Sequence, residues 1–367
     1  MEINKIHQGN ALELLKQLPD NFIDMGITSP PYWRQRDYKS EPSIWNEKEN
    51  CEHQWDFQER FLHRGTINTP TVHSALNRGG LETEWKTKDA FCLKCGAWLG
   101  QLGLEPDFNL YIKHLCDIFD EVKRVLKKEG SFWLNIGDTY GGSGGDSGKT
   151  GEFRTTKGVD KRPIDMSTQG NQQSTKGFEK SLLGIPFRFA TAMIDKGWRL
   201  RNTIIWHKPS CMPQSVTDRF TNDFEYLFFF VKNKNYYFEQ QFEPITESYV
   251  ERTKYAYSGN KGNADRFWIG QPNGKKEINP LGRNKRTVWN INPEPSSDIH
   301  FAHFPTELIR TPILACCPKD KGIVMDMFIG SGTTGIVAEE LGRNWIGMEI
   351  NPDYVKLANE RIKNLPL

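Results

Sequence analysis

Residue types and spacings that suggest chemistry first occur in the segment ITSPPYWRQRDY, residues 27–38. The apolar run before it predicts a buried strand, and Pro30-Pro31 stops that strand because proline has no backbone N–H for a sheet ladder. A strand that ends in this way presents the Ser29 hydroxyl and rigid carbonyl oxygens at the sheet edge. These acceptors would suit a ligand that donates hydrogen bonds. A plain proline turn with Tyr32 packed on the core fits the same residues, so the rest of the chain has to decide.

A second motif lies near the other end of the chain, in GIVMDMFIGSGTTGIVAEELGRNWIGMEINP, residues 322–352. The pattern predicts a strand that ends in Asp326, a glycine turn at 330–332, a helix from Thr333 and a second strand that ends in Glu349. In dinucleotide-type sites such glycines let the backbone approach a ligand at the helix N-terminus, and the acid binds ribose hydroxyls. The motif contains no GK[ST], so it does not predict a nucleoside triphosphate.

Helices and strands alternate at both ends of the chain. The hydrophobic periodicity predicts strands at 3–8, 22–27, 131–136, 200–206 and 225–231, and helices at 10–18, 111–126 and 185–193. Residues 127–130 are expected to end a helix before the next strand begins. Residues 305–367 predict helix, strand, helix, strand, helix. This alternation predicts a doubly wound α/β sheet.

The segments TSPPYW and FIGSGTTG, in this order, resemble the motifs of the permuted, beta-type amino-methyltransferases of DNA, of the N4-cytosine type. The resemblance covers most of the chain, in segments at residues 9–33, 104–138, 182–209 and 300–367. It implies an α/β, Rossmann-like fold of S-adenosylmethionine-dependent methyltransferases with a circularly permuted motif order. The C-terminal segment then supplies the first two strands of the unpermuted sheet, and both chain ends form one site at its switch point.

The resemblance also implies that S-adenosylmethionine binds over the glycine turn, with Glu349 on the ribose. The family usually has an acid at the position of Asn10, near the adenine, and the amide found here can still accept from the adenine amine through its carbonyl. Residues 303–305 are expected to pack against the methionine or adenine part. The implied cofactor-binding residues are Asn10, Thr28, His303, Phe304, Pro305, Asp326, Phe328, Gly330, Ser331, Gly332, Thr333, Thr334 and Glu349.

The implied reaction is methyl transfer to the exocyclic amine of a base that is flipped out of duplex DNA. The catalytic residues would be Ser29, Pro30, Pro31 and Tyr32. The serine hydroxyl and the Pro30 carbonyl accept the amine N–H groups, the prolines keep these acceptors rigid, and the tyrosine stacks on the base. In the family, serine here commonly accompanies cytosine N4 and aspartate adenine N6, so we favour cytosine. Adenine N6 methylation, action on RNA, and a zinc-containing DNA-binding protein without turnover stay open as alternatives.

An insertion at residues 51–100 holds cysteine and histidine at spacings that suit a metal site. Its CxxCG turn is typical of a zinc knuckle, in which glycine lets backbone amides approach a thiolate. His63 or His73 could replace the histidine ligand, and free thiols on a turn are the alternative. The residues expected to bind a structural, noncatalytic zinc are Cys51, His53, Cys92 and Cys95.

Charge is segregated along the 367 residues, although the net charge is only +2. Residues 140–216 carry 12 Lys and Arg against 6 Asp and Glu, and residues 251–290 carry 9 against 3. This distribution is expected of two segments that face a polyanion, although solvated loops would give the same counts. The residues expected to contact DNA are Trp33, Arg34, Arg36, Lys208, Arg252, Lys254, Arg283, Lys285 and Arg286.

The expected division of the chain follows from these features. Residues 1–50 form the N-terminal part of the catalytic core, 51–100 the zinc-knuckle insertion, 101–232 more of the core with a mobile basic loop at 140–180, 233–298 the target-recognition region, and 299–367 the cofactor-binding part. Seven cysteines fit a reducing compartment, and no apolar run is long enough to cross a membrane, so we expect a cytoplasmic protein. The family resemblance implies a prokaryotic or phage protein. The implied partners are double-stranded DNA and a cognate restriction endonuclease in the same system, and no membrane.

Overall fold

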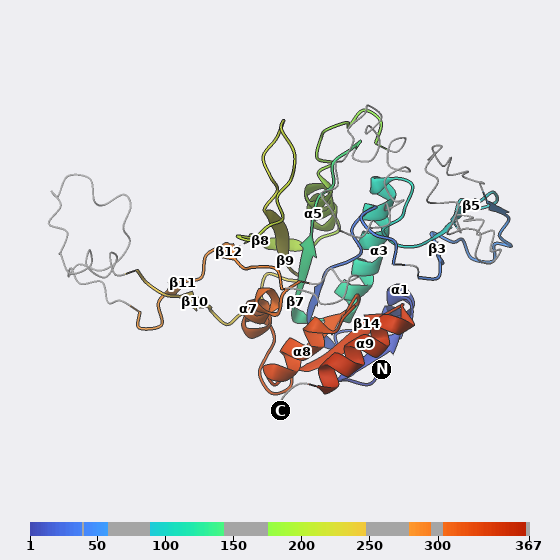
Figure 1. Ribbon diagram of the computed structural model, residues 1–367. Coiled ribbons are helices and arrows are strands. Elements are labelled where there is room, and N and C mark those ends of the chain that lie inside the picture. Colours follow the sequence, from blue (N-terminus) through green and yellow to red (C-terminus); the bar gives the residue numbers. More distant parts are fainter. Residues whose placement is uncertain (39, 58–88, 143–174, 247–278, 295–303, 365–367) are drawn as a thin grey trace, which may run out of the picture.

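The computed structural model describes residues 1–38, 40–57, 89–142, 175–246, 279–294 and 304–364. Eight of the described strands form one mixed sheet in the order β1-β14-β13-β2-β7-β9-β8-β12 (Figure 1). The bounds of these strands are β1 (Lys5–Gln8), β14 (Asn344–Glu349), β13 (Ile323–Asp326), β2 (Ile23–Thr28), β7 (Leu126–Ile136), β9 (Phe224–Val231), β8 (Arg199–His207) and β12 (Val288–Asn290). Strand β9 runs antiparallel to β7 and β8, and the other pairs are parallel.

Strands from the two ends of the chain lie side by side in the middle of this sheet. β13 pairs in parallel with β2, with Val324 opposite Met25, and β14 pairs with both β13 and β1. The carboxyl ends of β13 and β2 therefore meet at one edge, which is where ligands bind in open α/β sheets. The two motifs that are far apart in the sequence are thus neighbours in space.

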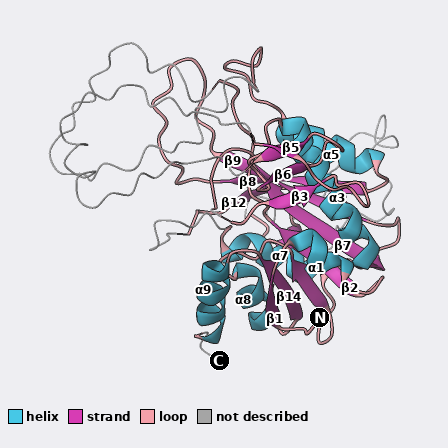
Figure 2. Cartoon of the chain, turned by 90° about the vertical axis from the view of Figure 1, so that its right-hand side faces the viewer, coloured by secondary structure: helices cyan, strands magenta, loops and turns pink. Residues whose placement is uncertain are grey.

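Helices cover both faces of the sheet (Figure 2). One layer holds α1 (Ala11–Lys16), α3 (Phe108–Val125) and α5 (Ile185–Asp195), and the other holds α7 (Thr306–Cys316), α8 (Thr333–Glu340) and α9 (Pro352–Lys363). Because successive side chains of a strand point to opposite faces, β7 gives Phe132 and Leu134 to the first core and Trp133 to the second. Each face of the sheet therefore has its own hydrophobic core, and the two cores hold three layers together.

The predicted alternation of helices and strands is confirmed in the described residues, with small shifts at the element ends. One expectation is wrong, because residues 127–130 lie inside β7 and do not precede it. A register shift between Ile23 and Met25 of β2 accommodates this polar stretch at the start of β7. Lys127 Nζ donates to both carboxylate oxygens of Asp24 at 2.8 Å, which gives the lysine a partner within the sheet.

The insertion expected at residues 51–100 belongs to a small antiparallel sheet that lies beyond α3 (Figure 1). In spatial order its strands are β3 (Ser43–Trp45), β6 (Trp98–Gly100), β5 (Ala90–Cys92) and β4 (Trp55–Asp56). The unit therefore begins before residue 51, because β3 pairs with β6. Strands of two or three residues are too short to give a periodic pattern, so the sequence does not predict them.

A buried contact between a carboxyl group and an imidazole fixes the small sheet to the main body. Glu105 and His114 are fully buried, with Nδ1 of the imidazole 3.0 Å from Oε1 of the carboxylate. The imidazole ring stacks on Trp45 at 4.6 Å and on Trp98 at 5.5 Å, both from the small sheet. The backbone carbonyl of Glu105 also accepts from Trp33 Nε1 at 3.0 Å. These contacts join the small sheet, α3 and the loop after β2.

Part of the region expected to recognise DNA, residues 233–298, belongs to the main sheet. β12 pairs in parallel with β8, with Trp289 opposite Trp206. β10 (Phe242–Glu243) and β11 (Arg283–Asn284) form a separate two-stranded ribbon. Most of the basic loop expected at 140–180 lies outside the described residues. Within the described part of the chain, no helix combines the length and the apolar composition needed to cross a membrane.

Candidate active site and Cys/His cluster

The carboxylate of Asp326 joins the two motifs at the carboxyl ends of β2 and β13. Thr28 Oγ1 donates to Oδ1 at 2.5 Å, and Thr334 Oγ1 donates to Oδ2 at 2.6 Å. The backbone N–H of Phe328 also donates to Oδ1 at 3.0 Å. Burial raises the pKa of the Asp326 carboxyl to about 6, against the lowering effect of these hydrogen bonds. Asp326 thus holds the strand of the N-terminal motif and the helix of the C-terminal motif in one arrangement.

The glycine turn has a backbone conformation that favours glycine, because Gly330 and Gly332 have φ values of +52° and +87°. A Cβ on Gly332 would lie 3.0 Å from the Cβ of Ala358, so glycine also lets the start of α8 pack closely against α9. The hydroxyls of Ser331 and Thr333, at the start of α8, are buried and have no hydrogen-bond partner among the described residues. Buried polar groups are normally paired, so these two hydroxyls point to a bound ligand.

Glu349 ends β14 and faces the glycine turn. Gly330 N donates to its Oε2 at 3.0 Å, and Asn351 N donates to its Oε1 at 2.8 Å. Burial raises the pKa of the Glu349 carboxyl to about 7, because the charged form is poorly solvated there and the two backbone donors compensate only in part. A carboxylate in this position can accept hydrogen bonds from the vicinal hydroxyls of a ribose.

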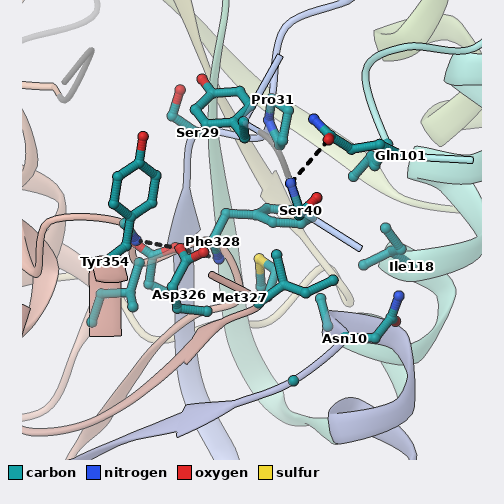
Figure 3. Close-up of a pocket in the computed structure, with 18 of the residues that line it drawn as sticks. Asn10, Ser29, Pro31, Ser40, Gln101, Ile118, Asp326, Met327, Phe328 and Tyr354 are labelled. Carbon is teal, nitrogen blue, oxygen red and sulfur yellow. Dashed lines mark hydrogen bonds between the residues drawn. The ribbon is translucent and has the colours of Figure 1, made fainter. Parts of the chain in front are cut away.

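A pocket runs along the edge of the sheet between the two motifs, with about 1080 Å³ of empty space that includes volume open to solvent. Figure 3 shows Ser29 and Pro31 at one end of the pocket and Asn10 at the other, with Asp326 between them. The residues predicted from the sequence that line it are Asn10, Ser29, Pro31, Phe304, Asp326, Phe328, Gly330, Ser331, Thr333 and Glu349. A catalytic-motif serine and the glycine turn thus share one pocket.

The remaining residues predicted for the cofactor and the reaction lie outside the pocket lining. Thr28 and Thr334 are buried behind the pocket, where they hold Asp326. Gly332 is the N-cap of α8, and Pro305 is the N-cap of α7. Pro30 is buried and Tyr32 lies beside the lining, whereas His303 is outside the described residues.

The expectation for the Asn10 carbonyl is wrong, because its oxygen is already in use. Asn10 is the N-cap of α1, and its Oδ1 accepts from Leu12 N at 2.9 Å and Glu13 N at 3.4 Å. Its amide nitrogen donates to Ser43 Oγ at 2.8 Å. The side chain therefore shapes the pocket wall and links it to the small sheet, but it offers no carbonyl for an adenine amine.

Tyr32 lies at the catalytic end of the pocket with its phenol held by two polar side chains. Tyr32 Oη donates to Glu225 Oε2 at 2.7 Å and lies 3.1 Å from Asn135 Oδ1. A Cβ on Gly137 would come within 2.9 Å of the tyrosine ring, so only glycine fits there. Burial, and then the adjacent Glu225 carboxylate, raises the pKa of the Tyr32 phenol well above its usual value. Ser29 Oγ donates to Tyr32 Oη at 3.5 Å.

Two residues expected to contact DNA from the loop after β2 have structural partners instead. Trp33 is only 1% exposed and donates to the carbonyl of Glu105, so the expectation that it touches DNA is wrong. Arg34 Nε donates to the same carbonyl at 3.2 Å, and the guanidinium lies over the Trp33 ring. Arg36 is exposed. The aromatic residue after the catalytic motif therefore belongs to the core.

Lys208 is also engaged within the protein. Its ammonium contacts Glu225 Oε1 and lies over the ring of Trp206, 4.3 Å from the ring centroid. The expected phosphate contact would have to break this pairing with a carboxylate that already holds Tyr32. Arg252 and Lys254 lie outside the described residues.

Two arginines near β11 donate to the same carboxylate, that of Glu243. Arg283 Nε and Arg286 Nε donate to Glu243 Oε1 at 2.7 and 2.6 Å. Lys285 Nζ lies 5.2 Å from the centroid of the Trp289 ring. Glu243 therefore holds both guanidinium groups at the ribbon formed by β10 and β11.

Several pocket residues are not predicted by the sequence. They come from the segment that leads into the small sheet, from the small sheet itself and from the start of α9. These residues are Tyr38, Ser40, Glu41, Ser43, Trp45, Gln101, Leu102, Ile350 and Tyr354. The polar loop after the catalytic motif gives no periodic signal, so spacing could not have identified its residues. Glu225 and Asn135 lie within predicted strands, where a lone polar residue at a strand end is the signal that identifies them.

The four metal-ligand candidates of the small sheet come together in a Cys/His cluster, defined by Cys51, His53, Cys92 and Cys95. One potential ligand atom from each lies within 4.8 Å of those of the others. Cys51 Sγ and Cys92 Sγ are 3.9 Å apart, and Cys95 Sγ is 3.5 Å from His53 Nδ1. Two thiolates bound tetrahedrally at ~2.3 Å from zinc would be ~3.8 Å apart, so the spacing matches a zinc site.

The family model and the relatives found by comparison with known proteins all describe DNA methyltransferases. The family model N6_N4_Mtase, described as DNA methylase, matches residues 23–360. The Type II methyltransferase M.SmaI of Serratia marcescens is 32% identical over 361 residues, 98% of this chain and 90% of that protein. M.Cfr9I of Citrobacter freundii is 32% identical over 366 residues, 99% of this chain and 89% of that protein.

A solved structure shares the fold. The PvuII DNA methyltransferase, named as cytosine-N4-specific, aligns with a TM-score of 0.53 at 19% sequence identity. The alignment covers 99% of this chain and 87% of that chain. The mixed α/β sheet with helices on both faces is therefore an arrangement that this enzyme shares.

The raised pKa of Glu349 gives a stability prediction for the ligand-free protein. The folded carboxyl keeps its proton up to about pH 7, whereas an unfolded glutamate loses it near its ordinary pKa of 4.5. The stabilisation from this group is complete below the unfolded value and is lost as pH rises through 4.5 to 7. Glu349→Gln cannot lose this stabilisation. The difference in unfolding free energy, variant minus wild type, should therefore increase by on the order of 3 kcal/mol between pH 4.5 and pH 8.

Urea unfolding at pH 4.5, 6 and 8 measures this difference. Glu360→Gln changes an exposed carboxyl of α9 and is the matched control, which should follow wild type throughout. A constant difference between Glu349→Gln and wild type across the three pH values would contradict the assigned burial of the carboxyl.

Proposed function

Because the chain belongs to the N6/N4 family of DNA methylases, we propose that it transfers a methyl group from S-adenosylmethionine to N4 of a flipped-out cytosine at a specific duplex DNA site. The observation that carries this proposal is that Ser29, at the carboxyl end of β2, lines one pocket with the glycine turn after β13. The Ser29 hydroxyl, which can accept a hydrogen bond, and the glycine turn, which suits a nucleoside, then face the same space. Action on RNA and binding without turnover are the competing functions, and no described contact favours either.

The residues at the glycine turn fit the cofactor. Ser331 and Thr333 supply two buried hydroxyls that have no hydrogen-bond partner within the described part of the chain, Glu349 supplies acceptors for ribose hydroxyls, and Phe328 adds an apolar wall. The backbone of Gly330 lies in the left-handed region that lets the turn open toward the ligand. When bound, S-adenosylmethionine supplies a methyl group activated by a sulfonium.

The catalytic end of the pocket fits an exocyclic amine. An aromatic amine is a weak nucleophile because its lone pair is delocalised into the ring, so acceptors that hold its N–H groups favour attack. Ser29 Oγ and the Pro30 carbonyl supply these acceptors, and Tyr32 supplies a face for stacking the flipped base. The carbonyl of Pro31 accepts from Tyr111 Oη at 2.8 Å, which anchors the proline pair to α3.

Serine rather than aspartate at position 29 supports cytosine over adenine. A neutral hydroxyl both accepts from and donates to its neighbours, whereas a carboxylate only accepts. In this family serine at this place commonly accompanies cytosine N4. Adenine N6 is the second candidate, since the same geometry could hold either amine.

The strand order supports a permuted arrangement of the motifs. β13 and β14 are the last two strands of the described chain but lie between β1 and β2 in the sheet. The curated relatives are Type II methyltransferases, so a role beside a cognate restriction endonuclease is part of the proposal. Target recognition is assigned to the described and undescribed parts of residues 233–298. Arg36, Arg283, Lys285 and Arg286 are its candidate DNA contacts.

The proposal includes a structural zinc ion held by the Cys/His cluster. The 3.9 and 3.5 Å separations match tetrahedral edges, and Gly96, with φ of +77°, shapes the turn after Cys95. Four protein ligands leave no open position, so the metal would have no part in the chemistry. The ion would stiffen a sheet whose strands are only two or three residues long.

The methylated base tests the function directly. Unmethylated genomic DNA is incubated with the protein and S-adenosylmethionine, digested to nucleosides and examined by mass spectrometry. The proposal expects N4-methylcytosine from wild type. Ser29→Ala should lower the yield by at least about 100-fold, on the scale at which positioned acid–base groups contribute, while cofactor affinity stays unchanged.

Ser210→Ala is the matched control, because this serine is exposed and lies outside the pocket. It should methylate like wild type. N6-methyladenine as the product would overturn the assignment of the base, and full activity in Ser29→Ala would overturn the role of the serine.

Metal analysis tests the zinc site. Protein purified without chelator should contain about one zinc per chain, and Cys92→Ser should lose the metal and unfold at a lower temperature. Cys211→Ser, which changes a thiol outside the cluster, should keep both metal and stability. Wild-type protein free of zinc, with all seven thiols titratable, would contradict this part of the proposal.

A further inference from the structure

A continuous chain of polar groups leads away from the serine at the end of β2. Ser29 Oγ donates to Tyr32 Oη at 3.5 Å, and Tyr32 Oη donates to Glu225 Oε2 at 2.7 Å. The first distance is at the outer limit of a hydrogen bond, as catalytic contacts often are before the substrate binds. The contact with the Glu225 oxygen is the shorter of the two acceptor contacts of the phenol, since Asn135 Oδ1 lies at 3.1 Å. Such an arrangement can carry a proton from the pocket to Glu225.

The Glu225 carboxylate, at the far end of this series of polar groups, is held by neighbouring side chains. Asn135 Nδ2 donates to Glu225 Oε2 at 3.2 Å and to the carbonyl of Tyr226 at 3.1 Å, which fixes the amide. Lys208 contacts the other carboxylate oxygen of Glu225. Lysine, asparagine and tyrosine are the charged and polar side chains that face this carboxylate among the described residues.

Asp326 and Glu349, two of the carboxylates that line the pocket, do not offer such a route. Asp326 accepts from Thr28, Thr334 and the backbone of Phe328, and each of these donors has a fixed structural task. Glu349 accepts from two backbone N–H groups at the cofactor end. Among the described acids, Glu225 is therefore the one connected to Ser29 by hydroxyl groups.

We propose that Ser29, Tyr32 and Glu225 form a relay that takes up the proton released when the target amine is methylated. This inference rests on the proposed function and assigns a task to three of the chain's own groups. As the nitrogen–methyl bond forms and the sulfur–methyl bond of the sulfonium breaks, the amine nitrogen gives one proton to Ser29 Oγ. The serine hydroxyl proton moves to Tyr32 Oη, and the phenol proton moves to the Glu225 carboxylate, which becomes neutral.

The relay also gives Lys208, which contacts Glu225, a positioning role. Lys208 contacts Oε1 of the carboxylate, which leaves Oε2 directed toward the Tyr32 hydroxyl before the reaction. The predicted phosphate contact of Lys208 is replaced by this positioning role. Gly137 has a related role, because a side chain there would push the tyrosine ring away from Glu225.

Glu225→Gln separates a relay from a purely structural contact. The amide oxygen can still accept the hydrogen bond from Tyr32, but the amide cannot take up the proton. The relay predicts that the single-turnover rate falls by about 100-fold, with unchanged KM for DNA and unchanged cofactor affinity by calorimetry. Tyr32→Phe keeps the stacking ring, breaks the same route and should show a similar fall.

The double variant tests whether the two residues act as one unit. Tyr32→Phe with Glu225→Gln should be no more than about threefold slower than the slower single variant, because a broken relay cannot be broken twice. Formate should raise the rate of Glu225→Ala severalfold, since a small carboxylate can occupy the vacated space and accept the proton. A lost structural contact would not respond in this way.

Asp223→Asn is the matched control, because it changes an exposed carboxyl two residues before Glu225 and should leave the rate unchanged. Glu225→Gln with a rate within threefold of wild type, or singles whose effects multiply in the double variant, would overturn the relay. Each variant rate is divided by the wild-type rate measured on the same base, whichever base the wild type methylates. A product other than N4-methylcytosine therefore overturns the proposed function without deciding the relay.

Discussion

The buried carboxylate of Asp326 is the constraint on which the site depends. It accepts hydroxyl hydrogen bonds from Thr28 of the N-terminal segment and Thr334 of the C-terminal segment, which are about as far apart in sequence as the chain allows. An unpaired buried carboxylate is costly, so both threonines must stay in place for the fold to tolerate it. These two contacts set the distance between the serine at the end of β2 and the glycine turn after β13.

The two cores and the small sheet then limit how this edge can move. β7 and β9 alternate aromatic side chains between the faces, so a shift of one strand would disturb both cores. The Glu105–His114 pair, stacked between Trp45 and Trp98, holds the small sheet against α3. The wall that this sheet adds to the pocket is thereby as fixed as the main sheet itself.

Much of the fold and part of the site follow from the sequence, because both depend on local patterns. Periodicity identifies the long helices and strands, and the glycine turn with acids at two strand ends identifies one half of the pocket. Side-chain partners do not follow, because Trp33, Asn10 and Lys208 find them in segments that the sequence does not relate to their own. The wall from the small sheet is missed for a second reason, since its strands are too short for a pattern.

The central claim is that both ends of the chain form one cofactor pocket. Hydrogen–deuterium exchange with and without S-adenosylmethionine tests it most directly, because backbone amides of each segment are followed separately. The account predicts slower exchange on binding in the peptides that hold residues 326–334 and 349 and also in those that hold residues 9–11 and 28–33. Protection confined to the C-terminal peptides, with the N-terminal ones unchanged at saturating cofactor, would contradict it.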